Sequence, residues 1–256
     1  MIDSRAVIDP SAKLASDVVV GPWTLIGPDV EIGAGTVIGP HVVIKGPTVI
    51  GENNRIFQFA SVGEDCQDKK YAGEPTKLIV GDNNVIREGV TIHRGTVQDA
   101  GVTIVGSDNL FMAYAHVAHD CVVGDNVIMA NNTAIAGHVH IGDWTILGGF
   151  TAVHQFCRIG AHVMCGTSTV VLKDIPDYIM ANGNTASPHG INVEGLKRRG
   201  FSADAIANIR RAYKIIYRQK LTVAQAITAL QALAATCPEI DSLIHSIESS
   251  NRGIIR

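Results

Sequence analysis

A six-residue periodicity constrains this chain more than any other feature of its sequence. Between residues 105 and 171 an apolar side chain falls on every sixth position, and a small or β-branched residue stands two positions earlier. Residues six apart cannot stay on one face of a 3.6-residue helix over many repeats, whereas a short strand followed by a tight turn can repeat indefinitely. We therefore expect a coil that turns a corner every six residues. The apolar positions are Val105, Phe111, Val117, Val123, Met129, Ile135, Ile141, Leu147, Val153, Ile159, Cys165 and Val171.

The same six-residue repeat runs from Ile8 to Val62, and it slips by one residue across 94–103 before Val105. Because side chains alternate across a strand, the apolar residue and the residue two before it both point inward. Three repeats close a triangle, so residues eighteen apart stack in neighbouring coils, about 4.8 Å apart. This pattern resembles the left-handed parallel β-helix of hexapeptide-repeat proteins. The left hand comes from the resemblance, since the general crossover preference is right-handed.

Two interruptions and a change of period divide the chain. We expect a β-helix over residues 1–189, with loops pushed out of its corners near 64–77 and 94–103, where the repeat is lost. The first loop is polar and is broken by Gly73 and Pro75. Long loops on a rigid scaffold often carry function.

From Ile191 onward the apolar period becomes helical. Ser202 is placed to cap one helix, and Thr222 with Gln225 forms a capping box for a second. Pro238 is placed to start a third helix. Residues 190–256 are therefore predicted to form a small α-helical C-terminal domain, which makes the whole chain mainly β.

Composition and cysteine placement narrow the class of protein. The chain is 46% hydrophobic but only 5% aromatic, as expected for an interior of stacked aliphatic side chains. No apolar run reaches the roughly 18 residues of a membrane span, and the start lacks a basic segment followed by an apolar one. Three of the five cysteines, Cys121, Cys157 and Cys165, fall on inward positions. We therefore expect a reduced, cytoplasmic protein without a membrane span.

Charge is unevenly distributed along the chain. Residues 190–256 hold ten Lys or Arg against five Asp or Glu, whereas residues 1–189 hold eleven against nineteen. A basic C-terminal part suggests an acidic partner, and a solvated helical surface explains the same charges equally well.

Histidines gather where the stacking rule brings distant residues together. Residues 118–120, 136–138 and 154–156 share one corner in three successive coils. Gly137 then lies directly above His119, and Asp120 lies below His138. A lone surface histidine usually has no function, but several on one edge indicate a site. The histidines between residues 116 and 154 are His116, His119, His138, His140 and His154, and Gln155 stands beside the last of them.

The chemistry of this corner suits acyl transfer from a thioester to a hydroxyl. Asp120 next to His119 would fix the imidazole tautomer and stabilise the cation that forms, so His119 is a candidate general base. The backbone N–H of Gly137 would stabilise a tetrahedral oxyanion. Zinc bound by histidines is the rival, as in carbonic anhydrases of the same architecture, but it leaves Asp120 and Gly137 without a role. No phosphate-loop, dinucleotide-binding or nucleic-acid motif occurs.

Longer segments carry a more specific resemblance. EDCQDKKYAGEPTK, TIHRGTVQ, AHVAHDC, AGHVHIGD, AVHQFCRIGAHVM and INVEGLKRRGF follow one another over most of the chain. In this respect the sequence resembles the UDP-N-acetylglucosamine O-acyltransferases, which catalyse the first step of lipid A biosynthesis. The resemblance implies a cytoplasmic homotrimer that transfers an (R)-3-hydroxyacyl chain from acyl carrier protein to the 3-hydroxyl of UDP-N-acetylglucosamine. It also implies sites between adjacent subunits and no bound cofactor or metal.

The resemblance assigns roles position by position. It makes His119 the general base, Asp120 its partner and Gly137 the oxyanion donor. Thr167 falls where the family limits acyl length, and because Thr is larger than Gly we expect a chain shorter than fourteen carbons. Other positions match substrate-binding residues: His116, His138, His154 and Gln155 for the sugar nucleotide, Asp68 and Lys70 in the first loop, and Asn192, Glu194, Arg198 and Arg199 for the nucleotide or pantetheine end.

Two other functions fit the same fold. A coenzyme A-dependent acetyltransferase would turn over acetyl-CoA but would leave the basic C-terminal part without a carrier-protein role. A non-enzymatic assembly scaffold would be unaffected by loss of His119, except in stability.

Overall fold

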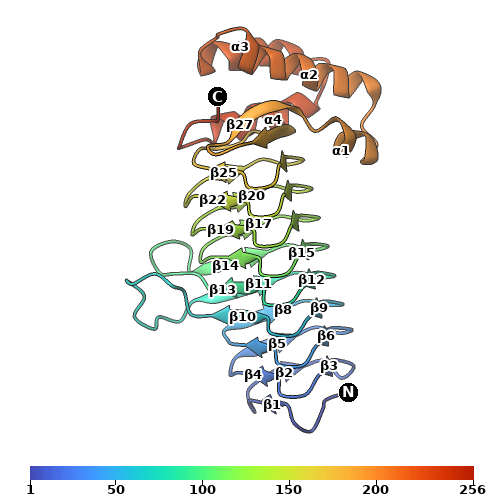
Figure 1. Cartoon of the computed structure of the whole chain (residues 1–256), viewed down its shortest axis with the longest axis vertical. Coiled ribbons are helices and arrows are strands. Elements are labelled where there is room, and N and C mark those ends of the chain that lie inside the picture. The colour runs from blue at the N-terminus through green and yellow to red at the C-terminus, as the bar shows by residue number, and fades with distance from the viewer.

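The computed structural model describes residues 1–256 and shows a tall triangular prism of short parallel strands, with helices over its C-terminal end (Figure 1). The predicted parallel β-helix and helical C-terminal part are confirmed. Each side of the prism is one sheet, and successive strands of the chain pass from sheet to sheet.

The three sheets contain nine, eight and ten strands. The nine-stranded sheet holds β1 (Val7–Ile8), β4 (Leu25–Ile26), β7 (Val43–Ile44), β10 (Ser61–Glu64), β13 (Thr91–His93), β16 (His116–Val117), β19 (Ala134–Ile135), β22 (Ala152–Val153) and β25 (Val170–Val171). The eight-stranded sheet holds β2 (Lys13–Leu14), β5 (Val30–Ile32), β8 (Thr48–Ile50), β11 (Lys77–Val80), β14 (Val102–Val105), β17 (Val122–Val123), β20 (His140–Ile141) and β23 (Arg158–Ile159). The ten-stranded sheet holds β3 (Val19–Val20), β6 (Val37–Ile38), β9 (Arg55–Ile56), β12 (Val85–Ile86), β15 (Leu110–Phe111), β18 (Ile128–Met129), β21 (Ile146–Leu147), β24 (Met164–Cys165), β26 (Ile179–Asn182) and β27 (Ser187–Ile191).

Strand register follows the eighteen-residue stacking rule. Val117 pairs with Ile135, and Ile135 pairs with Val153. These apolar residues and the positions two before them are buried; Thr133, for example, is fully enclosed and donates its hydroxyl to the carbonyl of Gly148 at 3.1 Å. The core is therefore a column of aliphatic side chains with a few internally bonded hydroxyls.

Corners of the prism carry residues in the left-handed region of φ. Asp120, His138 and Phe156 have φ of 57°, 62° and 65° and follow their inward apolar residue by three positions. This conformation costs a non-glycine residue roughly 1–2 kcal/mol, which the surrounding coil must offset. Because the corner repeats every eighteen residues, these three side chains stand in one column.

Two segments leave the prism on the same side, between β10 and β11 and between β13 and β14 (Figure 1). Arg94 ties them together. Its buried guanidinium donates to the carbonyl of Gly63 at 2.6 Å, to the hydroxyl of Tyr71 at 3.0 Å and to the carboxylate of Asp65. The first segment is thus fixed against the start of the second.

After β25 the chain continues as strands for longer than the apolar pattern indicates. β26 runs parallel to β24, and β27 then pairs with β26 in the antiparallel sense. The sequence pattern, which weakens beyond Val171, does not predict this pair. Its second strand carries Pro188 and Gly190, which obscure a strand pattern.

Four helices complete the chain: α1 (Val193–Arg198), α2 (Ala203–Arg218), α3 (Val223–Ala234) and α4 (Glu239–Glu248). Ser202 caps α2, and the predicted capping box of Thr222 and Gln225 opens α3. α4 begins directly after Pro238. The short helix α1, capped by Asn192, is an addition that the helical period does not predict. None of the four combines the length and apolar character that crossing a bilayer requires.

Candidate active site

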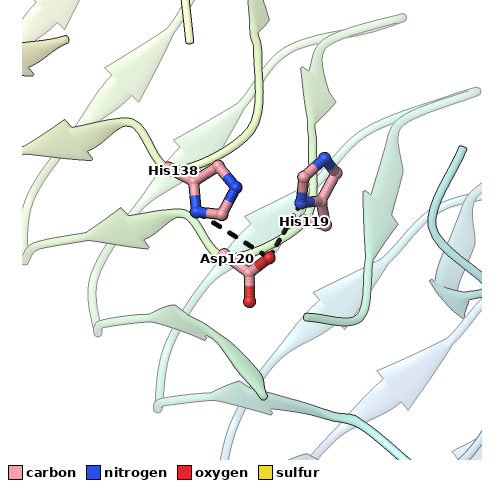
Figure 2. Close-up of side chains that lie close together, drawn as sticks. All are labelled: His119, Asp120 and His138. Atoms are coloured by element: carbon pink, nitrogen blue, oxygen red, sulfur yellow. Dashed lines mark hydrogen bonds and ion pairs between the residues drawn. The ribbon is translucent and has the colours of Figure 1, made fainter. Parts of the chain in front are cut away.

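A histidine and an aspartate form a bonded pair on the edge between the nine- and eight-stranded sheets, which we call the site edge. His119 Nδ1 lies 2.8 Å from Asp120 Oδ2, and the Asp120 side chain is only 1% exposed (Figure 2). The neighbouring residues of the next coil, Gly137 and His138, stand on the same edge. The structure thus brings together the residues that the stacking rule places at one corner.

Asp120 is held as a charged acceptor. The backbone N–H of Thr96 donates to Oδ1 at 2.8 Å and its hydroxyl donates to Oδ2 at 2.6 Å. Burial alone would raise the pKa of Asp120, but the hydrogen bonds from His119 and Thr96 outweigh burial and hold the pKa below its usual value. A carboxylate only accepts hydrogen bonds, so the proton must be on His119 Nδ1. In the neutral imidazole, Nε2 then carries the lone pair.

Gly137 lies against the imidazole of His119. A Cβ added at this glycine would stand 2.6 Å from Nε2 and 2.5 Å from Cε1 of His119, so no side chain fits. The Gly137 N–H donates to no acceptor in the protein. A residue with an unused peptide N–H and a candidate base are therefore in contact, as an oxyanion donor and a base require.

A cavity of about 670 Å³ opens in front of this pair, over the nine-stranded sheet. The cavity is lined by small outward side chains of β19 and β22, and the loop after β10 closes one side of it. Predicted site residues that line it are Asp68, His116, His119, Gly137 and Gln155.

His93 also lines this cavity, although sequence reasoning gives it no role. Its ring meets that of His116 edge-on with centroids 5.1 Å apart, and His116 Nδ1 lies 2.7 Å from the hydroxyl of Thr91. Burial lowers the pKa of His93, and burial together with His93 lowers that of His116 to about 4. Both rings are therefore neutral near pH 7. The eighteen-residue stacking rule does not place His93 beside His116, because β13 pairs with β16 at an offset of twenty-five residues.

His138 does not line this cavity. Its Nδ1 lies 2.7 Å from Asp99 Oδ2, and its ring stacks on Phe156 with centroids 4.3 Å apart. The ring also meets His119 edge-on at 5.0 Å. His154 is exposed and contacts the carbonyl of Gln155 at 3.1 Å through Nδ1. Asp99, which belongs to the second excursion, is a further contact that the sequence does not reveal.

The lysine at the cavity differs from the one that the resemblance indicates. Asp68 and Lys69 line the cavity, whereas Lys70 does not. The backbone N–H of Lys70 donates to Asp68 Oδ1 at 2.9 Å, and the Lys70 side chain is exposed.

A second cavity, of about 780 Å³, lies on the ten-stranded sheet beneath α1. Asn192, Glu194, Arg198 and Arg199 all line it, together with outward apolar side chains of β15, β18, β21 and β24. The guanidinium of Arg199 lies over the ring of Trp144, 5.3 Å from its centroid. Within one chain the structure does not bring these four residues to His119, because they occupy another face of the prism.

Thr167 is exposed at the edge between the ten- and nine-stranded sheets, and it lines neither cavity. This edge also carries Trp23, Phe59, Tyr114 and Phe150, whose side chains are 55–66% exposed. We call it the aromatic edge.

Metal-binding capacity is limited to one group of side chains. His119, Asp120 and His138 each place a ligand atom within 4.8 Å of the others. Asp120 Oδ2 is already engaged by His119 and Thr96, so a metal would have to replace at least one of these contacts.

Comparisons with known proteins agree along the whole chain. Residues 103–137 match the family model described as bacterial transferase hexapeptide (six repeats), and residues 174–255 match that described as Udp N-acetylglucosamine O-acyltransferase, domain 2. A protein of Ectopseudomonas mendocina named acyl-(acyl-carrier-protein)–UDP-N-acetylglucosamine O-acyltransferase is 63% identical over 255 residues, covering 100% of this chain and 99% of its own. A relative from Pseudomonas paraeruginosa with the same name is 60% identical over 256 residues, with 100% and 99% coverage.

Solved structures show the same relationship. LpxA from Acinetobacter baumannii superposes with a TM-score of 0.98 at 54% identity, covering 100% of this chain and 99% of that one. UDP-N-acetylglucosamine O-acyltransferase from Moraxella catarrhalis gives a TM-score of 0.98 at 48% identity, with the same coverage. With relatives 60–63% identical over the full length of the chain, the chain belongs to the UDP-N-acetylglucosamine O-acyltransferase family.

Proposed function

We propose that this protein transfers an (R)-3-hydroxyacyl chain from acyl carrier protein to the 3-hydroxyl of UDP-N-acetylglucosamine, the first step of lipid A biosynthesis, with His119 as general base. The substrates are those named for its relatives. The observation that carries the mechanism is the His119 ring, bonded through Nδ1 to Asp120 and packed against Gly137, whose N–H has no acceptor in the protein, at a cavity that both residues line.

In this mechanism Nε2 removes the proton of the sugar hydroxyl as its oxygen attacks the thioester carbonyl carbon. The Gly137 N–H donates to the carbonyl oxygen as it becomes negative. Collapse of the tetrahedral intermediate breaks the carbon–sulfur bond, and the leaving thiolate takes the proton back from His119. Asp120 stabilises the imidazolium throughout. General base catalysis of this kind contributes about 10²–10⁴-fold.

Neutral neighbours favour this use of His119. With pKa values below the ordinary histidine value, His93 and His116 carry no positive charge that would oppose protonation of His119. Their ring nitrogens remain available to bind sugar hydroxyls by hydrogen bonds. We assign sugar-nucleotide binding to this side of the cavity, with Asp68 and Gln155 in its lining and His154 beside Gln155. His138 does not line the cavity, and we expect it to act only through its edge-on contact with His119.

We further propose that the active protein is a homotrimer. Four largely exposed aromatic residues on one edge are typical of an interface. Packing the nine-stranded face of one subunit on the ten-stranded face of the next, with aromatic edges at the three-fold axis, would bury them. The same packing would bring the cavity beside His119 and the cavity beneath α1 of a neighbour together, so that Asn192, Glu194, Arg198 and Arg199 could hold the nucleotide or pantetheine.

The helical domain offers a surface for the carrier protein. Arg210, Arg211, Lys214 and Arg218 lie on α2 and are all exposed; Arg211 also contacts Asn208, and the guanidinium of Arg218 lies over the ring of Tyr213. Complementary charge speeds encounter with an acidic partner such as acyl carrier protein.

We propose that the reaction uses no metal or bound cofactor and takes place in the cytoplasm. The proton on His119 Nδ1 and the Thr96 hydroxyl already satisfy Asp120 Oδ2, so the base is oriented without an ion. All five cysteines are free and buried, which suits a reducing compartment.

One assay separates these proposals from their rivals. Wild-type protein treated with EDTA should acylate UDP-N-acetylglucosamine from 3-hydroxyacyl carrier protein, and His119→Ala should be slower by about 10²–10⁴-fold. Turnover of acetyl-CoA instead would support the acetyltransferase alternative. Activity that persists unchanged in His119→Ala would contradict the proposed base, and activity lost with EDTA would contradict a metal-free reaction.

A further inference from the structure

The rear side of the catalytic pair gathers three ligand atoms of the kind that bind transition metals, on His119, Asp120 and His138, and a fourth, on Asp99, contacts one of them. His119 Nδ1 and Asp120 Oδ2 are 2.8 Å apart, His138 Nδ1 and Asp120 Oδ2 are 3.9 Å apart, and His138 Nδ1 and Asp99 Oδ2 are 2.7 Å apart. Figure 2 shows the imidazoles of His119 and His138 turned toward the same carboxylate oxygen. Tetrahedral zinc with bonds of about 2.0–2.2 Å keeps its ligand atoms roughly 3.3–3.6 Å apart. His119, Asp120 and His138 already hold their ligand atoms within 4.8 Å of one another, and Asp99 would have to move in from its contact with His138.

We propose that His119, Asp120, His138 and Asp99 form an inhibitory site for Zn²⁺ and chemically similar divalent ions. The ligands are imidazole nitrogens and carboxylate oxygens, which zinc accepts in place of thiolates. Thr96 fixes the carboxylate of Asp120, and Phe156 holds the ring of His138, so the site has the outer support that metal ligands need. Asp99, with 48% of its side chain exposed, gives access from solvent.

A metal ion bound at this site would inactivate His119 through Nδ1, the ring nitrogen that does not contact the substrate. A metal on Nδ1 of His119 takes the place of the proton, and a neutral imidazole then carries that proton on Nε2. No proton is gained or lost overall, but Nε2 becomes a donor and cannot accept the proton of the sugar hydroxyl. Neither Asp99 nor His138 lines the substrate cavity, so the ion and the sugar nucleotide do not compete for space. This inference rests on the proposed role of His119.

Direct binding tests the site independently of activity. The full-length protein is titrated with Co²⁺ and followed by its visible absorption. We expect one Co²⁺ for each chain and no thiolate charge-transfer band. Asp99→Asn and His138→Gln should each weaken binding by about tenfold or more. His189→Asn is the matched control, because His189 is exposed on β27 and contacts only Ser187. Absence of binding, a thiolate band, or wild-type affinity in both site variants would overturn the proposal.

Steady-state kinetics with added Zn²⁺ tests whether an ion bound at this site prevents His119 from acting as the base. We expect Zn²⁺ to lower kcat while leaving KM for UDP-N-acetylglucosamine unchanged, with full recovery after EDTA. A rise in KM alone would place the ion on Nε2 and overturn the arrangement described here. Should the protein prove inactive toward these substrates, the proposed function fails, but the Co²⁺ titration still decides whether the site exists.

Discussion

Replacing Gly137 by alanine is the sharpest single change that the structure offers. The added methyl would lie 2.6 Å from His119 Nε2, and an ordinary contact needs at least 3.4 Å, so the ring must move by about 0.8 Å. The backbone of Gly137 does not have a positive φ, so the change adds no backbone strain. A displacement near 1 Å at a catalytic group costs about 10²-fold in rate.

We therefore expect Gly137→Ala to lower kcat by about 10²-fold, with a smaller change in KM for the sugar nucleotide. The assay is acylation of UDP-N-acetylglucosamine by 3-hydroxyacyl carrier protein, with thermal melting to show that the variant folds. Gly27→Ala serves as the control, since a methyl there would meet no atom closer than the carbonyl oxygen of Ile44 at 3.5 Å. The double variant with His119→Ala should lose little more than His119→Ala alone, because groups that act as a unit are not additive. Activity within a few fold of wild type would refute the tight fit between this glycine and the base.

Three further changes test other parts of the structure. Thr96→Val removes one hydroxyl donor from charged, buried Asp120 and should cost about 1.5–3 kcal/mol of unfolding free energy. Because the folded pKa of Asp120 is depressed, this loss should be present above the unfolded pKa of about 3.9 and vanish as the pH falls through the folded value, as urea unfolding at pH 7 and pH 3 would show. For Thr167, carrier proteins loaded with ten, twelve and fourteen carbons should reveal a preference below fourteen that Thr167→Gly moves toward fourteen; a preference for fourteen that Thr167→Gly leaves unchanged would contradict it. Tyr114→Arg places a charge on the aromatic edge and should dissociate the trimer in sedimentation experiments, whereas Ile79→Arg, on the outward face of the eight-stranded sheet, should not.

Periodic parts of the structure follow from the sequence, and the parts outside the period do not. The six-residue repeat fixes which side chains point inward, and its eighteen-residue stacking places His119, Asp120 and Gly137 on one edge. Helix N-caps such as Ser202 can also be predicted from the sequence, because they depend on only a few neighbouring residues.

Contacts made by the two segments that leave the prism cannot be predicted in this way, because a loop has no repeating register from which its residues can be placed. Thr96 and Asp99 reach Asp120 and His138 from across a break in the repeat, and nothing in the local sequence indicates this. Likewise, nothing in the loop sequence shows that Lys69 lines the cavity and Lys70 does not. The antiparallel pairing of β27 depends on tertiary context in the same way.

The stacking of base and oxyanion donor on consecutive coils also limits how such a chain can change length. Each coil touches only the coils above and below it, so an insertion of one whole coil before β10 would lengthen the prism and leave His119 under Gly137. The same eighteen residues inserted between these two would separate them by an extra layer, and a single-residue insertion there would turn the imidazole to another side. Length variation that preserves activity should therefore come in whole coils and be confined to the ends of the prism.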